Sequence, residues 1–232
     1  MAALLSSNSY VGRGIAAGKT PDGKKAVCVY FIMGRSANSR NRVFALKNGT
    51  LFTEPFDPAL VKDPSLIIYA ALRRFENRLI VTNGDQTDTV FDFLQKGKTF
   101  YEALETRCFE PDAPNFTPRI SAMLTFANGD FTYDFSILKS ADAAGSACVR
   151  QGFSYPSLPG TGHFLHTYVC NGEPIPSFVG EPERITVGQD IDAWSKSIWD
   201  ALDQDNKISL YVRYIDLKTG EAEDRLFNKN RK

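Results

Sequence analysis

The pattern of apolar and polar residues divides the first quarter of the chain into short segments typical of β-strands. Residues 9–17 and 25–33 are predicted strands, and the second, KAVCVYFIM, is rich in β-branched and aromatic residues. The GKTPDGK segment between them contains glycine, proline and aspartate, so the two strands are expected to form a hairpin with a longer loop. RVFALK and TLFTEPF are further predicted strands, and Asn48-Gly49 between them is a strong hairpin signal.

The middle of the chain changes from strand to helix periodicity. The segment SLIIYAALRRF, from Ser65, is compatible with helix or strand, and its β-branched start favours a strand. RLIVTNGD is expected to be a short buried strand that ends in a turn. Residues 86–107 carry apolar residues at helical spacing, and Gly97 is expected to divide them into two helices.

The last part of the chain returns to short strands. RISAMLTF, DFTYDFSIL, CVRQGFSY and GHFLHTYV are predicted strands separated by Asn-Gly, proline and glycine turns. IDAWSKSIWDAL is expected to be an amphipathic helix, and KISLYVRYIDL a last long strand followed by a polar tail. With no internal repeat or linker, residues 1–232 are expected to form one domain of the α+β class, with helices covering sheet faces.

Composition and charge argue against some classes of binding partner for this protein. Hydrophobic residues make up 43% of the chain, which is enough for a sizeable core. Lys+Arg and Asp+Glu both number 27, so the basic excess of a typical nucleic-acid binder is missing. The segment MAALLSSNSYVG does not resemble a signal peptide, and no run approaches the ~20 apolar residues that cross a bilayer. We therefore expect a cytoplasmic protein with neither a nucleic-acid nor a membrane partner.

The cysteines and histidines do not predict a metal site. Cys28, Cys108, Cys148 and Cys170 are not closely spaced in sequence and are expected to be free and largely buried. His163 and His166 are expected to face opposite sides of a strand, which makes them a poor pair of metal ligands. The common phosphate-binding and hydrolase motifs, GxGxxG, GxxxxGK[ST] and GxSxG, do not occur.

A polar and basic cluster follows the second predicted strand. Residues 34–42, GRSANSRNR, contain three arginines, whose planar guanidinium groups match phosphate oxygens, together with serine and asparagine donors. A loop that leaves the end of a strand is a common place for ligand binding, although a solvated basic loop is the alternative. Glycines flank Arg13 on the first strand, which indicates a bulge or a close backbone approach there.

Two further polar groups lie downstream. Residues 83–89, NGDQTDT, join a buried strand to a predicted helix, where Thr87 or Asp85 can act as the N-cap and free amides suit an anion or a carbonyl. A tight turn with a helix cap is the simpler interpretation of the same residues. Glu110 lies upstream of Arg119 in a proline-rich loop, where its carboxylate can be a general base or a salt-bridge partner.

These segments occur in an order that resembles a known family. YVGRG, GRSANSRNR, PSLIIYAALR, VTNGDQTDT and TPRISA together are similar to the archaeal-type IMP cyclohydrolase family and its bacterial relatives, from Tyr10 to about Ala122. The later GTGHFLHTYVCNGEPIPSF resembles the longer bacterial members. The resemblance implies a four-layer αββα sandwich like that of the N-terminal-nucleophile hydrolases. It also implies the dehydrative closure of 5-formamido-1-(5-phospho-ribosyl)imidazole-4-carboxamide to IMP, with no metal or organic cofactor.

The start of the chain bears on this resemblance. Enzymes with an N-terminal nucleophile expose Cys, Ser or Thr at the mature N-terminus, whereas removal of Met1 here would leave Ala2. We therefore expect the fold without the N-terminal nucleophile and without its covalent chemistry. A ring closure within one substrate needs no enzyme nucleophile.

The resemblance also implies roles for individual residues. Arg42 is expected to stabilise the oxyanion that forms on the formyl oxygen, Tyr69 to orient the formyl group or supply a proton, and Glu110 to accept the amide proton. The chemistry of the residue types further suggests Arg13, Arg35, Ser36 and Ser39 for the 5′-phosphate, and Asn83, Thr87 and Arg119 for the carboxamide, ring edge or ribose. Asn41, Gly84 and Asp85 complete the set of expected substrate-binding residues.

Two other functions remain open at this point. A protein that keeps the pocket for a purine ribotide but has lost turnover would act as a sensor. An amidohydrolase or acyltransferase acting on another phosphoribosyl amide would also use the early motifs. In each case the partner is a small phosphorylated molecule, and assembly into a homo-oligomer is left open.

Overall fold

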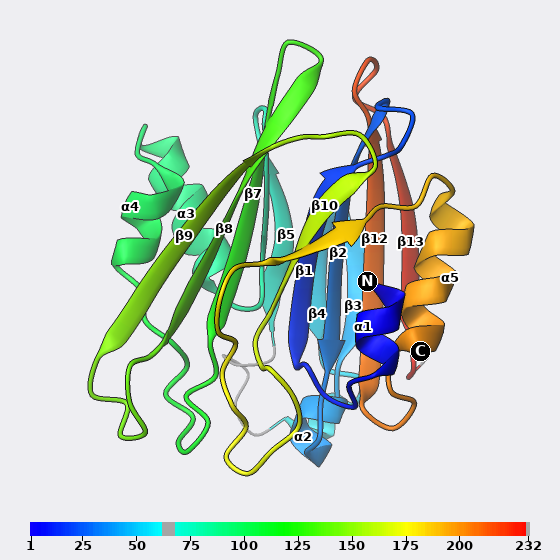
Figure 1. The fold of residues 1–232 in the computed structure, drawn as a ribbon. Coiled ribbons are helices and arrows are strands. Elements are labelled where there is room, and N and C mark those ends of the chain that lie inside the picture. The colour runs from blue at the N-terminus through cyan, green and yellow to red at the C-terminus, as the bar shows by residue number, and fades with distance from the viewer. Residues whose placement is uncertain (62–67, 231–232) are drawn as a thin grey trace.

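Two antiparallel sheets pack face to face, with helices on the outer side of each (Figure 1). The computed structural model describes residues 1–61 and 68–230. Within these residues, one sheet has six strands and the other has seven. The chain is therefore of the α+β class with few helices, as the sequence pattern predicts.

The first sheet is built around the predicted N-terminal hairpin. Arg13 pairs with Ile32 and Lys19 with Ala26, so the two hairpin strands run antiparallel as expected. In spatial order the sheet consists of β11 (Glu183–Thr186), β10 (Thr161–His166), β1 (Arg13–Lys19), β2 (Lys25–Met33), β12 (Lys207–Asp216) and β13 (Ala222–Asn228).

The second sheet is a meander in which each strand pairs with its neighbour in sequence. It consists of β3 (Val43–Lys47), β4 (Thr50–Glu54), β5 (Tyr69–Phe75), β6 (Arg78–Thr82), β7 (Arg119–Ala127), β8 (Asp130–Ser140) and β9 (Cys148–Pro156). The ambiguous segment from Ser65 is a strand from Tyr69 onward, as its β-branched start favours, while residues 65–67 lie outside the described residues. Sequential antiparallel pairing needs only short turns, and Asn48 and Gly49 supply one with positive φ angles of 50° and 79°.

Three apolar clusters explain the order of the layers. The largest fills the space between the sheets and includes Tyr30 and Tyr69 from facing strands. A second lies between the first sheet and the helices α1 (Ala2–Ser6) and α5 (Ile191–Ala201). A third joins the second sheet to α3 (Gln86–Gln95) and α4 (Phe100–Glu105). The molecule therefore has four layers in the order helices, sheet, sheet, helices (Figure 1).

The predicted helices form for the expected local reasons. Gly97, with a φ of 72°, ends the first of the two helices in residues 86–107. Thr99 and Glu102 then form a capping box at the start of α4. In α5 the Asp190 side chain accepts a hydrogen bond from the amide of Ala193, and Ile191 and Ile198 are buried against the sheet.

Two local predictions were wrong, and two short elements were not predicted. The segment after β12 is not a polar tail: residues 222–228 form the edge strand β13, which pairs with β12 from Ile215–Ala222 to Ser209–Asn228. The basic loop after β2 contains a short helix, α2 (Ala37–Arg40), held by a capping box between Ser36 and Ser39. The short elements α1 and β11 had no sequence signal, because they form by packing rather than by periodicity.

Candidate active site

A cavity of about 270 Å³ opens at the end of the sandwich that carries α2 (Figure 1). Its volume is near the lower end of the ~300–1,000 Å³ typical of small-molecule sites. Four chain segments meet there: the start of β1, the β2–β3 connection, the loop before β7 and the loop after β10. The lining residues are Tyr10, Arg13, Arg35, Ser36, Asn38, Ser39, Arg42, Glu110, Asp112, Asn115, Thr117, Tyr168 and Ile175.

Three charged side chains in this cavity are buried: Arg13, Arg42 and Glu110 retain only 7%, 5% and 7% of their accessible surface. The Nε atoms of both arginines are buried without a hydrogen-bond partner. Among the described residues, no ion pair within 4.0 Å joins the three side chains to one another or to another residue. Buried charges without partners are costly, so their presence together in a cavity indicates a binding site for a polar, charged ligand.

The backbone holds these groups in place. Arg13 begins β1, and the preceding Gly12 has a φ of 76°, where an added Cβ would lie 2.1 Å from the Thr167 hydroxyl oxygen. Only glycine fits this approach, which confirms the expected close backbone contact beside Arg13. The amide of Glu110 donates to the carbonyl of Thr117 at 2.9 Å, which ties the carboxylate-bearing segment to the start of β7.

The electrostatics of the cluster are set by burial and by mutual charge. Burial raises the pKa of Glu110, and the nearby Arg13 and Arg119 only partly oppose this. Burial lowers the pKa of Arg42, and the charge of Arg13 adds to the effect. Burial also disfavours the charged form of Arg13, but Glu110 and nearby tyrosines outweigh it and raise the pKa of Arg13. Glu110 is thus a buried carboxyl group whose charge is disfavoured by burial and favoured by nearby arginines, and perturbed groups of this kind are typical of functional sites.

Tyr69 lies next to this cluster and is 5% exposed. It is not among the residues that line the cavity, but it is close enough to affect the pKa of both Arg13 and Arg42. Its hydroxyl is 2.9 Å from the hydroxyl of Tyr30. The three residues expected to act on the reacting group, Arg42, Tyr69 and Glu110, are therefore neighbours in space.

The segment 34–39 forms one rim of the cavity. The hydroxyls of Ser36 and Ser39 are 3.1 Å apart and cap α2, and both residues line the cavity. Arg35 donates to the Asn171 side chain at 2.8 Å and to the Gly172 carbonyl at 2.9 Å. Arg35 thus ties the loop after β10 to this rim.

An aromatic and polar wall completes the cavity, and the sequence analysis did not find it. Tyr10 and Tyr168 stack with ring centroids 5.9 Å apart, and the Tyr168 hydroxyl is 2.6 Å from that of Thr117. The Thr117 amide donates to Asp112 at 2.6 Å, and Asn115 lies in the same loop. The only sequence signal was the clustering of Asp, Pro and Asn in residues 111–115, which reads equally well as an ordinary turn.

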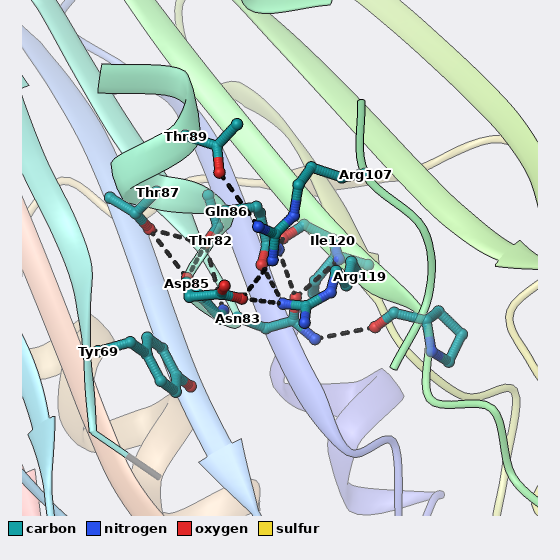
Figure 2. A network of polar contacts seen from close by, with 12 residues as sticks. Tyr69, Thr82, Asn83, Asp85, Gln86, Thr87, Thr89, Arg107, Arg119 and Ile120 are labelled. Carbon is teal, nitrogen blue, oxygen red and sulfur yellow. Dashed lines mark hydrogen bonds and ion pairs between the residues drawn. The ribbon is translucent and has the colours of Figure 1, made fainter. Parts of the chain in front are cut away.

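The second expected cluster forms a network beside the cavity (Figure 2). The Asn83 side chain donates to the Pro118 carbonyl at 2.9 Å and accepts from the Ile120 amide at 2.8 Å. Arg119 donates to Asp85 and to Gln86, both at 2.7 Å. None of the 83–89 residues lines the cavity. Their polar groups bind one another, and Figure 2 draws Tyr69 without a contact to them.

Asp85 and Thr87 do not cap α3 through their side chains, which corrects the prediction. Asp85 accepts hydrogen bonds from Arg107 at 2.6 Å and Arg119 at 2.7 Å, and the Thr87 hydroxyl lies 2.7 Å from that of Thr82. Burial disfavours ionised Asp85, but the bonds and charges of the two arginines outweigh it and lower the pKa of Asp85. At Gly84, an added Cβ would lie 2.4 Å from Arg119, so a side chain there would displace the guanidinium.

Asn41 also lies outside the cavity lining. Its side-chain amide donates to the Asp57 carbonyl at 2.8 Å and accepts from the Asp57 amide at 2.7 Å. Both polar groups of Asn41 are therefore used to hold the segment after β4, next to Arg42.

The cysteines are less buried than expected. All four are free, but only Cys28 is buried, whereas Cys108 and Cys170 are exposed and Cys148 is intermediate. A search of the described residues for groups of three or more His, Cys, Asp or Glu that could hold a metal ion found none. In the part of the chain that the structure describes, no helix is long and apolar enough to span a membrane.

A second cavity, of about 220 Å³, lies at the opposite end of the sandwich between the β5–β6, β7–β8 and β12–β13 turns. Its buried arginine, Arg213, pairs with Asp224 at 2.8 and 3.0 Å. Because this charge is already neutralised, the cavity beside Arg13 and Arg42 is the better candidate for an anionic ligand.

The chain is similar to known proteins along most of its length. A family model described as "IMP cyclohydrolase-like protein" matches residues 10–221, so the chain belongs to that family. An IMP cyclohydrolase from Methanopyrus kandleri is 30% identical over 198 residues, which cover 80% of this chain and 98% of that protein. IMP cyclohydrolases from Methanothrix thermoacetophila and Methanococcus aeolicus are 32% and 28% identical over 121 and 165 residues, covering 50% and 69% of this chain and 58% and 75% of their own.

Proposed function

We propose that this protein is an IMP cyclohydrolase, which closes the second purine ring of 5-formamido-1-(5-phospho-ribosyl)imidazole-4-carboxamide and releases water. The observation that carries the proposal is a pair of buried arginines, whose Nε atoms have no hydrogen-bond partner among the described residues, beside a buried carboxylate. Membership of the IMP cyclohydrolase-like family gives independent support. A substrate whose formyl oxygen becomes negative and whose amide must lose a proton fits both kinds of charge.

The first step joins the carboxamide nitrogen to the formyl carbon. An amide nitrogen is a weak nucleophile, so holding the two groups in contact supplies part of the rate. Arg42 and Arg13 stabilise the negative charge that develops on the formyl oxygen. Glu110 accepts the proton that leaves the carboxamide nitrogen, a role that its raised pKa favours. It then passes this proton to the formyl oxyanion, which becomes the hydroxyl of the carbinolamine, and Glu110 is a carboxylate again.

The second step removes water from the carbinolamine. The carbon–oxygen bond breaks, its electron pair stays on oxygen, and Tyr69 gives the departing hydroxyl a proton. The formamido nitrogen gives up its proton to Glu110, and the electron pair of this N–H bond forms the carbon–nitrogen double bond. Glu110 then passes the proton to Tyr69, which restores both groups. Both hydrogens of the released water thus come from the substrate, and the steps need no metal or organic cofactor.

The remaining cavity residues are proposed to bind the rest of the ribotide. Ser36, Ser39 and Arg35 form the rim nearest solvent and suit the 5′-phosphate. The effect of Glu110 and Tyr69 on the pKa of Arg13 supports a place for Arg13 beside the reacting group rather than the phosphate. The residues at positions 83–87 are proposed to act indirectly, because their network holds Arg119 near Glu110.

The order helices, sheet, sheet, helices supports the proposed kinship with the four-layer αββα sandwich of the N-terminal-nucleophile hydrolases. We propose one domain for residues 1–232, since both sheets contribute to one continuous core. The cytoplasm is the proposed compartment, because the charged ribotide would not cross a membrane unaided.

The direct test is to incubate the purified protein with the formylated ribotide and to follow IMP by chromatography. Rapid appearance of IMP, dependent on protein concentration, is expected. If the protein binds IMP but forms none, the sensor function replaces catalysis. Release of formate from the ribotide instead of IMP would identify an amidohydrolase.

A further inference from the structure

Tyr30 is a buried tyrosine whose hydroxyl contacts Tyr69, one of the residues proposed to act on the substrate. It lies on β2, is fully buried, and stacks on Phe44 with ring centroids 5.2 Å apart. Its hydroxyl is 2.9 Å from that of Tyr69. This is the one side-chain hydrogen bond that Tyr30 makes with residues 1–61 and 68–230. Because the side chain is packed on all sides, its hydroxyl cannot turn to another hydrogen-bond partner.

Either hydroxyl can be the donor in the hydrogen bond between Tyr30 and Tyr69. Each phenol has one proton to donate, and a buried O–H group that donates to nothing is unfavourable. Tyr30 has no other acceptor among the described residues, whereas Tyr69 lies near Arg13 and Arg42, where a bound substrate can accept its proton. With Tyr30 as the donor, the proton of Tyr69 is left for that substrate. Burial raises the pKa of Tyr30 well above its usual value, so Tyr30 keeps its own proton.

We propose that Tyr30 is a positioning residue that turns the proton of Tyr69 toward the substrate and stabilises Tyr69 when that proton is transferred. This inference rests on the proposed ring closure. As the carbinolamine loses its hydroxyl, the proton of Tyr69 goes to the departing oxygen and leaves a phenolate. The hydrogen bond from Tyr30 strengthens as the Tyr69 oxygen becomes negative, and it is released again when the proton from the formamido nitrogen restores Tyr69.

The test is a double-substitution cycle on the rate of ring closure. Tyr30→Phe keeps the ring and its stacking on Phe44, and it should lower kcat about 10-fold with little change in KM, because the lost bond acts in the transition state. If Tyr30 acts through Tyr69, the doubly substituted Tyr30→Phe/Tyr69→Phe protein should be no slower than Tyr69→Phe alone.

Tyr211→Phe is the matched control. Tyr211 is directly opposite Tyr30 on the neighbouring strand β12 and is equally buried, but its hydroxyl donates to Asp224 at 2.7 Å and does not reach the cavity. Its loss should affect the unfolding temperature and leave kcat close to that of the wild-type protein.

If the wild-type protein is active and the kcat losses of Tyr30→Phe and Tyr69→Phe multiply in the double variant, the proposed role of Tyr30 is wrong. It is also wrong if Tyr30→Phe has the kcat of the wild-type protein. A wild-type protein that forms no IMP would overturn the proposed function and this role with it. Should Tyr30→Phe fail to fold, 3-fluorotyrosine at position 30 decides the question. It keeps the ring and hydroxyl and is a stronger donor, so kcat should rise, and an unchanged kcat would contradict the proposal.

Discussion

Replacing Arg42 with methionine should make the ligand-free protein more stable, although it removes a group needed for catalysis. Arg42 is 5% exposed, and its Nε atom is buried without a hydrogen-bond partner. Burial and the neighbouring Arg13 both lower the pKa of Arg42, so its charge is held against an unfavourable environment. Methionine has a flexible apolar side chain that can fill the same space.

The size of the effect follows from what is removed. An unsatisfied buried donor costs about 1–3 kcal/mol, and apolar replacements of buried ionic groups often gain 1–4 kcal/mol. Glu110 keeps Arg13 as a neighbouring cation, so the carboxylate does not become an isolated charge. We therefore expect the free energy of unfolding to increase by about 1–3 kcal/mol.

The assay is urea unfolding in phosphate-free buffer, followed by the fluorescence of Trp194 and Trp199 on α5. The matched control is Arg213→Met. Arg213 is 7% exposed, but it pairs with Asp224 at 2.8 and 3.0 Å, so its loss leaves the half-buried Asp224 carboxylate with Tyr211 as a donor but without its cation. This control should lose about 1–3 kcal/mol.

Binding of IMP should distinguish the Arg42→Met protein from the wild-type protein as well. At 100 times its dissociation constant, IMP should stabilise the wild-type protein by about 2.7 kcal/mol, and the Arg42→Met protein by much less. If Arg42→Met destabilises the ligand-free protein by more than about 1 kcal/mol, Arg42 is a structural residue, and the idea that its charge is reserved for a ligand is refuted.

The remaining predictions concern three other charged residues. Because burial raises the pKa of Glu110, kcat/KM should fall on acidification through a pKa above the usual ~4.3 of a glutamate. Glu110→Gln should abolish this pH dependence and lower kcat about 10²–10⁴-fold. If the variant still loses activity at low pH in the same way, another group causes the loss. Asp85→Asn should cost about 1–2 kcal/mol at neutral pH. Because the pKa of Asp85 is lowered, its contribution exists above its unfolded pKa and is lost as the pH falls, so wild type and variant should converge below about pH 4; an equal difference at pH 3 and pH 7 would contradict this. Arg35→Ala should weaken IMP binding by about 1–3 kcal/mol in calorimetry, and an unchanged dissociation constant would leave Arg35 only its contacts to the loop after β10.

Local signals predicted most of the strands and the longer helices. The hairpin at Asn48-Gly49 and the division at Gly97 depend on residues that adopt positive φ, so neighbouring residues alone decide them. Strand β13 was missed because its sequence, AEDRLFN, is half polar and alternates little. It is a strand because β12 offers it an edge, and a pairing of this kind is a property of the tertiary structure.

The candidate site was predicted in part. Arg13, Arg42 and Glu110 were proposed as site residues, and the fold brings them to one cavity from three separate segments. The residues 83–87 have side chains equally suited to ligands and to internal hydrogen bonds. Their true partners, Arg107 and Arg119, lie far along the chain, so the sequence could not show that the network was already satisfied.

The cavity wall formed by Tyr10, Asp112 and Tyr168 could not be predicted from the sequence for the same reason. Each residue type is common in cores and loops, and nothing in its neighbourhood marks it as part of a site. Only the packing of the loop after β10 against the start of β1 brings Tyr168 to Tyr10. Tyr30 was likewise part of an apolar strand pattern, and its contact with Tyr69 depends on the two sheets facing each other.

The most direct test of the account compares the rate of IMP formation by the wild-type protein with that of Arg42→Lys and Tyr69→Phe, while the IMP affinity of each is measured. Lysine keeps the charge of Arg42 but not the planar fork, and phenylalanine removes only the hydroxyl of Tyr69. If both groups act in the transition state, kcat should fall by about 10²–10³ in each variant while IMP binds nearly as before. Full activity in both variants, or IMP binding without IMP formation by the wild-type protein, would contradict the claim that this cavity catalyses ring closure.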